Sequence, residues 1–188
     1  MASEVDICNM ALRRLGAERI TSLADTTKRA KLCNDAYTLV RDRVLRSHPW
    51  NFAMRRVTLA KLVTTPEFGF DNEFQLPSDC LRVIRIDDYE PEEINYVVEG
   101  DKLLIDEPSV KISYISKVTN TAEYEANFIQ VLAWELALEL SYGLNQSNTL
   151  ISEVRGELRM LKADARLYDA QEGKPRQFYK SDWTDERL

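Results

Sequence analysis

Two kinds of apolar spacing divide the chain into regions. Near both ends, apolar residues recur every three or four positions, as they do on one face of an α-helix. Between these regions, short runs rich in β-branched and aromatic residues alternate with Pro and Gly, which is typical of strands and turns. The pattern predicts helices over residues 4–15, 28–47, 127–144 and 148–172, with a strand-rich segment between the second and the third.

Capping residues and helix breakers set the boundaries of the first two helices. Ser3 precedes the first helix and Gly16 follows it, and Thr26 or Thr27 caps the second. Pro49 ends the second helix, because it lacks an N–H and disfavours helical geometry in the residue before it. The predicted buried stripes are Val5, Cys8, Ala11, Leu12 and Leu15 in the first helix, and Cys33, Ala36, Tyr37, Val40 and Val44, widened by Leu32 and Leu39, in the second.

The middle segment predicts an antiparallel unit of five or six strands. Its apolar runs are followed by turn-forming residues, and residues 94–106 predict a hairpin that turns at Glu99, Gly100 and Asp101. The helices on either side must pack together to bury their apolar faces. The expected fold is therefore α+β, with a four-helix bundle core (residues 1–51 plus 120–172), an inserted antiparallel β domain (residues 52–119) and an extended C-terminal tail (residues 173–188).

The fourth helix carries a different charge on each of its flanks. The flanks lie beside a predicted core stripe of Ile151, Val154, Leu158, Leu161, Ala165 and Tyr168. The basic flank contains Arg155, Arg159, Lys162 and Arg166, and the acidic flank contains Glu153, Glu157 and Asp164. Such a helix is either solvated, with ion pairs at short spacing, or it contacts a different neighbour on each side.

The tail contains three aromatic residues in an otherwise polar stretch. Phe178, Tyr179 and Trp183 follow Gly173 and Pro175, which end the regular pattern. Three aromatic side chains cannot form a core of their own. They either fold back on the helices or bind in a groove of a partner.

Composition excludes several functional classes. The 188 residues are 44% hydrophobic, enough for a sizeable core, and the net charge of −6 argues against a dedicated nucleic-acid-binding protein. One His and three widely spaced Cys residues provide no zinc site of the usual spacing. No apolar run is long enough to cross a membrane and the first residues do not form a signal peptide, so we expect a protein made in a cytoplasm, with no cofactor and no membrane anchor.

Candidate catalytic groups are few. His48, before Pro49, is either a general base or a residue that bonds free carbonyls at the helix end; the second interpretation is favoured, since no nucleophile motif accompanies it. Trp50 and Phe52 follow and are expected to fill the core at this corner. The pairs Glu135–Glu139 and Glu153–Glu157 could serve a glycosidase, but such pairs are frequent by chance in a chain with 31 acidic residues. No glycine-rich phosphate loop is present.

The first fifty residues carry a more specific pattern. The stretch "ALRRLGAERITSLAD", the helical pattern from Ala30 to Leu45 and the "HPWNFA" that follows resemble the tail tubular protein A and head-to-tail adaptor family of short-tailed bacteriophages. "EFQLPSDCLRVIRI" in the strand-rich segment is also similar to this family, and "LAWELALELSYGL" matches it more loosely. The tail after Gly173 has no counterpart in the resemblance.

The resemblance implies a structural virion protein without catalytic residues. Members of this family form a dodecameric ring between the portal and the tail nozzle, through which genomic DNA passes without specific binding. It implies a location in the neck of the virion after assembly in the host cytoplasm. The partner-binding candidates are then the charged residues of the fourth helix and the three tail aromatics. A peptidoglycan-degrading virion enzyme and a cytoplasmic helical adaptor remain the alternatives.

Overall fold

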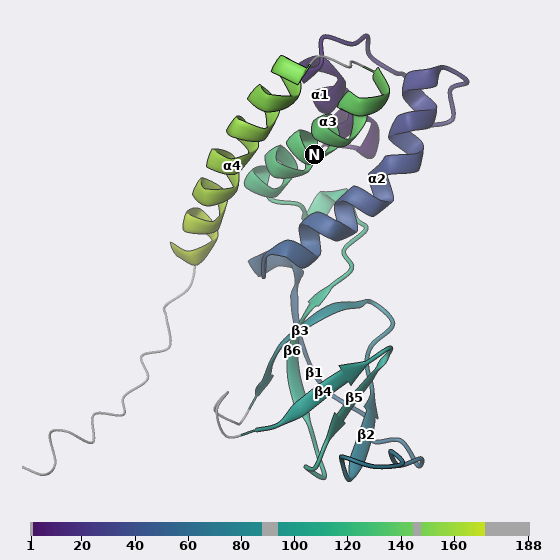
Figure 1. Cartoon of the computed structure of the whole chain (residues 1–188), viewed down its shortest axis with the longest axis vertical. Helices are drawn as coiled ribbons and strands as arrows, with labels where there is room; N and C mark the ends of the chain where they lie inside the picture. Colours follow the sequence, from purple (N-terminus) through teal and green to yellow (C-terminus); the bar gives the residue numbers. More distant parts are fainter. Residues whose placement is uncertain (1, 88–93, 145–147, 172–188) are drawn as a thin grey trace, which may run out of the picture.

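The computed structural model describes residues 2–87, 94–144 and 148–171 of the chain. Within these residues the fold is α+β, as predicted, with four helices at one end and two three-stranded antiparallel sheets at the other (Figure 1). The helices are α1 (Glu4–Arg14), α2 (Lys28–Ser47), α3 (Ala126–Leu144) and α4 (Asn148–Gln171). The strands are β1 (Met54–Thr58), β2 (Asn72–Gln75), β3 (Cys80–Asp87), β4 (Tyr96–Glu99), β5 (Lys102–Ile105) and β6 (Lys111–Ser116).

Local capping bonds form where the sequence predicts them. The Ser3 hydroxyl accepts a hydrogen bond from the Asp6 backbone N–H at 3.1 Å, and the Asp6 carboxylate accepts one from the Ser3 N–H at 3.0 Å. These bonds satisfy two donors that a helix N-terminus leaves free. Gly16, at φ 66°, ends the first helical segment in the left-handed conformation that glycine adopts without strain. Thr27 caps α2 through the N–H of Ala30.

Helix α3 lies at the centre of the helical layer. The main helix contacts join α3 to α1, to α2 and to α4, and Figure 1 shows α2 and α4 on either side of it. This position explains its composition, because a helix that is covered on several sides needs apolar residues around most of its circumference. The prediction that the third helix is largely buried is therefore confirmed.

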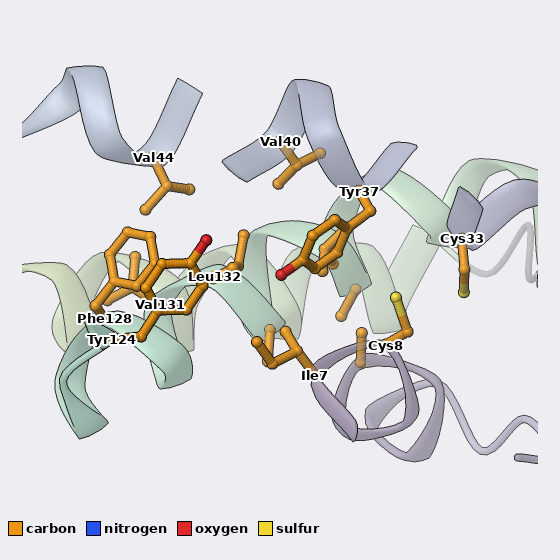
Figure 2. Packing of buried hydrophobic residues seen from close by; sticks show 14 of the residues in the cluster. Ile7, Cys8, Cys33, Tyr37, Val40, Val44, Tyr124, Phe128, Val131 and Leu132 are labelled. Carbon is orange, nitrogen blue, oxygen red and sulfur yellow. The ribbon is translucent and has the colours of Figure 1, made fainter. Parts of the chain in front are cut away.

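The helical core is closed at one corner by aromatic rings. Trp50 is 2% exposed and lies edge-on to Phe128, with ring centroids 5.3 Å apart. Phe52 and Tyr124 also lie against Phe128, at 5.0 and 4.8 Å. Edge-to-face pairs of this kind add stability beyond the buried area. The prediction that Trp50 fills the corner is confirmed, and Figure 2 shows the neighbouring core, where side chains of α2 point towards α1 and α3.

Six strands are present among the described residues, in agreement with the predicted five or six, but they form two sheets. One sheet has the order β1-β6-β3 and the other has the order β2-β5-β4. The β4–β5 hairpin turns at Gly100 and Asp101, as predicted, with Gly100 at φ 61°. A second apolar core, which includes Phe74, Leu103 and Ile112, lies in this part of the molecule.

One apolar position of α2 was predicted wrongly. Leu39 is 66% exposed and does not widen the buried stripe. It lies two residues after Tyr37, and a step of two residues turns a helix by more than half a circle, away from the core. The remaining residues of the predicted stripe are buried or half-buried.

Candidate functional site

Helix α4 is the element on which the sequence places most of the candidate partner-binding residues. Its buried positions Ile151, Val154, Leu158 and Ala165 face the rest of the helical layer, as predicted, and Leu161 is half-buried. The prediction is wrong at Tyr168, which is 56% exposed. Asp169 takes the buried position in the last turns of α4 instead, because its carboxylate has partners there.

Asp169 connects the end of α4 to residues 48–51, which follow α2. Its Oδ2 lies 2.8 Å from Nε2 of His48, and its Oδ1 accepts a hydrogen bond from the Asn51 N–H at 2.9 Å. The Asn51 side chain also donates to the Asp169 carbonyl oxygen at 2.8 Å. A buried carboxylate needs partners of this kind. The cluster therefore joins two elements that are more than a hundred residues apart in the sequence.

The expected role of His48 changes accordingly. His48 is the C-cap of α2, but the free carbonyl of Val44 accepts its hydrogen bonds from the Trp50 indole at 3.1 Å and from the Ser47 hydroxyl at 2.8 Å. His48 binds the carboxylate of another helix instead. Among the described residues, the contacts of the His48 ring are the Asp169 carboxylate and the Trp50 ring, whose centroid lies 5.0 Å away.

A second polar cluster joins α2, α3 and α4. Glu135 of α3 is 8% exposed; one of its oxygens is 3.3 Å from Arg43 of α2, and the other pairs with Lys162 of α4. Arg43 also pairs with Glu139 at 3.2 Å. The first of the two carboxylate pairs suggested by the sequence thus acts as a link between helices. Lys162, a candidate for partner binding, is engaged within its own chain.

The outer face of α4 is both apolar and charged. Met160 and Leu167, seven residues apart, are 59% and 57% exposed, on the side of the helix away from the buried stripe. Glu153, Glu157 and Asp164 are exposed along one side of these residues, and Arg159 and Arg166 along the other. Arg155 on the basic side donates a hydrogen bond to the Tyr142 hydroxyl at 2.6 Å. Among the described residues, Arg159 and Arg166 form no ion pair.

The sequence predicted only part of this face of α4. The two charged flanks were identified, but the exposed pair Met160 and Leu167 between them was not. Met160 and Leu167 are seven residues apart, which is about two helical turns, and this spacing could have predicted that they lie on the same face of α4. The tail aromatics Phe178, Tyr179 and Trp183 lie outside the described residues.

A shallow apolar groove lies between α2 and α3. It has a volume of about 230 Å³, and its walls include Leu32, Leu39 and Leu140, with the carboxylates of Asp35 and Glu139 beside them. The two helices approach closely at its end, since a Cβ on Gly143 would lie 3.0 Å from a methyl carbon of Leu32. The exposure of Leu39 is thus part of an apolar surface and not an isolated exception.

Metal-binding groups and thiols are the other candidates for chemistry in the part of the chain that the structure describes. No group of three or more His, Cys, Asp or Glu side chains there is placed to hold a metal ion. Cys8 and Cys33 are buried between α1 and α2 (Figure 2), and a hydrogen bond with Cys33 together with burial raises the pKa of the Cys8 thiol, which keeps it protonated and unreactive. None of the described helices has the length and hydropathy needed to span a membrane.

Comparisons with protein-family models and with curated proteins give no match to this chain.

Proposed function

We propose that this chain is a structural virion protein, a head-to-tail adaptor that forms a ring between the portal and the tail nozzle of a short-tailed phage. The four helices form the bundle core of each subunit in the wall of the ring. The ring, a dodecamer by analogy with the family that the N-terminal residues resemble, extends the channel through which genomic DNA passes. It is assembled in the host cytoplasm and remains in the neck of the virion.

The observation that carries the proposal is the outer face of α4. A helix that is fixed to its own subunit by Lys162 and Asp169 still exposes Met160, Leu167 and Tyr168 to solvent. Large apolar side chains clustered on a rigid helix are typical of a surface that contacts another protein. Charged residues on both sides of them, as at the polar rim of an interface, would fix the orientation of that partner.

The overall shape supports the same proposal. The helices lie at one end of the elongated molecule and the sheets at the other, so the two ends present different surfaces (Figure 1). A connector must bind unlike neighbours above and below itself. The net charge of −6 per subunit favours a channel that does not hold DNA tightly, because phosphate binding depends on clustered basic side chains.

The hydrolase alternative gains no specific support. Glu135 and Glu139, the pair on α3, bind cations of the neighbouring helices, and Glu139 lies beside the small α2–α3 groove of about 230 Å³. Glu153 and Glu157 are exposed on the outer side of α4, whereas ligands are usually enclosed in concave sites.

The experiment combines the purified chain with portal rings of the phage that encodes it. Light scattering and electron microscopy should show a mass gain of twelve chains and a ring seated below the portal. Mass spectrometry of purified virions should detect the chain in stoichiometric amount. Failure to join the portal, together with absence from virions, would contradict the proposal and favour the cytoplasmic adaptor.

A cell-wall assay separates the remaining alternative. The purified chain is incubated with peptidoglycan beside two variants, Glu139→Gln and Glu157→Gln. We expect no release of soluble sugar from any of the three. Release by the natural chain that one of these substitutions abolishes would establish the hydrolase instead.

A further inference from the structure

The subunit has two exposed apolar surfaces on different sides of α3. One is the outer face of α4, formed by Met160 and Leu167. The other is the α2–α3 groove, with Leu32 and Leu39 in its wall. Figure 1 places α2 and α4 on either side of α3, so the two surfaces face different neighbours.

The two surfaces match in length. Met160 and Leu167 are seven residues apart in α4, and Leu32 and Leu39 are seven residues apart in α2. At about 1.5 Å per residue, each pair spans roughly 10 Å along its helix. A helix face with apolar residues two turns apart fits a groove with the same repeat, because side chains of one helix can then lie between those of the other.

The basic side of the α4 surface is opposite in sign to the groove, and the acidic side, with Glu153, Glu157 and Asp164, lies across the apolar pair from it. Arg159 and Arg166 lie along the apolar residues of α4 and form no ion pair within the described residues. Asp35, which lines the groove, forms none there either. Glu139 adds a second carboxylate at the groove, where Arg43 also binds it. Docking of α4 would thus bring unpaired cations to a carboxylate that lacks a partner.

We propose that the outer face of α4 in one copy of the chain docks in the α2–α3 groove of the next copy. The inference rests on the proposed function and deepens it, by naming the surfaces that join neighbouring subunits. Each copy then offers one α4 face and one groove, so the contact is head-to-tail. A head-to-tail contact closes into a ring when its rotation is an integral fraction of a full turn.

Pairing of α4 with α4 explains less of the surface. A twofold contact between two α4 faces would leave Leu39 and the groove uncovered in both subunits. It would also end at a dimer, because the surface that pairs is then used up. The head-to-tail contact covers both apolar surfaces of every subunit except at an open end.

Disulfide trapping tests this arrangement with the full chain. One chain carries Leu39→Cys and a second, of different mass, carries Leu167→Cys. Both are mixed and oxidised mildly. We expect the mixed dimer to form at least tenfold faster than either homodimer, since only the mixed pair brings the two thiols together. The natural chain is the control, because Cys8 and Cys33 are buried and Cys80 is half-buried.

A chain that carries both substitutions extends the test. It should form a ladder of covalent oligomers that ends at the closed ring, and the largest member counts the subunits. Met160→Glu should reduce the trapping yield at least tenfold, whereas Val63→Glu, at a fully exposed position far from both surfaces, should leave the yield unchanged. Both sites are exposed, so neither substitution threatens folding.

The outcomes separate this inference from the proposed function. Homodimers of Leu167→Cys alone would establish α4–α4 pairing and overturn the inference. Assembly of the natural chain on the portal without any mixed dimer would also overturn it, while leaving the proposed function intact. Mixed dimers and a closed ladder without binding to the portal would support the inference and contradict the proposed function.

Discussion

The helical core and the β core are built from different parts of the chain. The helical core combines buried side chains from α1 to α4, and it includes Ile115 of β6. Among the described residues, the β core uses only side chains from Val57 to Tyr114. A core that needs both ends of the chain forms only when distant segments meet, whereas a core within one segment closes a shorter loop. We therefore expect the helical core to set the global stability and the β core to open separately, at a lower free energy.

The largest effect is expected at the corner of the helical core. Trp50→Ala should lower the free energy of unfolding by about 3–5 kcal/mol, because it removes the ring that packs on Phe128 and leaves a cavity. Urea unfolding followed by circular dichroism measures the change. Phe68→Ala is the control, since Phe68 is 86% exposed and its loss should cost almost nothing. A Trp50→Ala protein as stable as the natural chain would contradict the role of this corner.

A substitution in the β core should act more locally. Phe74 is 1% exposed, and Phe74→Ala should cost about 3 kcal/mol, near the lower end for a buried Phe. Hydrogen exchange should then show faster exchange in β2 and β5 and unchanged exchange in α3. If α3 loses protection to the same extent, the two cores open together and the comparison fails.

The tie at the end of α4 should have an intermediate effect. Asp169→Ala leaves the Asn51 N–H and the His48 ring without their carboxylate, and we expect a loss of about 1–3 kcal/mol. His48→Ala removes one hydrogen bond to Asp169 and an edge contact with the Trp50 ring, and it should cost about 1 kcal/mol. Thermal unfolding of both variants measures the difference. A larger loss in His48→Ala than in Asp169→Ala would show that the carboxylate is not the centre of this cluster.

Local features were predictable because their causes are local. The caps at Ser3 and Thr27 and the hairpin turn at Gly100 follow from residues within four positions of each other. The strand-rich segment, predicted to hold five or six strands, forms six, since alternation and turn residues mark them in the sequence. The division of these strands into two sheets depends on which strands pair, and spacing alone does not reveal that.

The wrong predictions concern positions where a contact with a residue far away in the sequence determines which of two neighbouring residues is buried. Tyr168 and Asp169 both continue the helical spacing from Ala165, and the apolar residue was the natural choice. The bonds to His48 and Asn51 select Asp169, and no local pattern encodes them. In the candidate site, the charged flanks of α4 could be read from the sequence, but the engagement of Lys162 by Glu135 could not.

A smaller effect distinguishes the β core by its pH dependence. Glu73 accepts hydrogen bonds from the Thr64 hydroxyl and from Lys102 at 3.0 Å, and these contacts hold the pKa of its carboxyl below the ordinary value. A lowered pKa contributes stability that is present above about pH 4.5 and is lost as the pH falls through the pKa of the folded state.

The comparison of Glu73→Gln with the natural chain isolates this contribution. The variant should have a lower urea midpoint for the β core than the natural chain at pH 7, and this difference should be smaller at pH 3. Lys61→Gln, at an exposed position close by, is the control and should show no such convergence. A difference that is equal at both pH values would mean that the carboxylate charge does not contribute.

The smallest expected effect concerns a hydroxyl inside the helical core. Tyr37 is 2% exposed and points from α2 towards α1 and α3 (Figure 2). Within the described residues its hydroxyl makes no hydrogen bond of ordinary geometry, and its polar neighbour is the Tyr124 hydroxyl. Burial raises the pKa of Tyr37, so the hydroxyl stays neutral. A buried polar atom without a partner costs free energy, and removing it can be neutral or favourable. Tyr37→Phe should therefore leave the free energy of unfolding unchanged or raise it by up to about 1 kcal/mol.

Tyr124→Phe is the matched control for this substitution. Its hydroxyl donates a hydrogen bond to the Val118 carbonyl oxygen at 2.9 Å, so its removal leaves a buried acceptor unpaired. We expect a loss of about 1 kcal/mol, measured by urea unfolding at pH 7 in parallel with Tyr37→Phe. Both variants delete a buried hydroxyl from the same core, and of the two only the Tyr124 hydroxyl donates a hydrogen bond of ordinary geometry. An equal loss in both would show that Tyr37 has a partner after all, and that the helical core tolerates no unpaired hydroxyl.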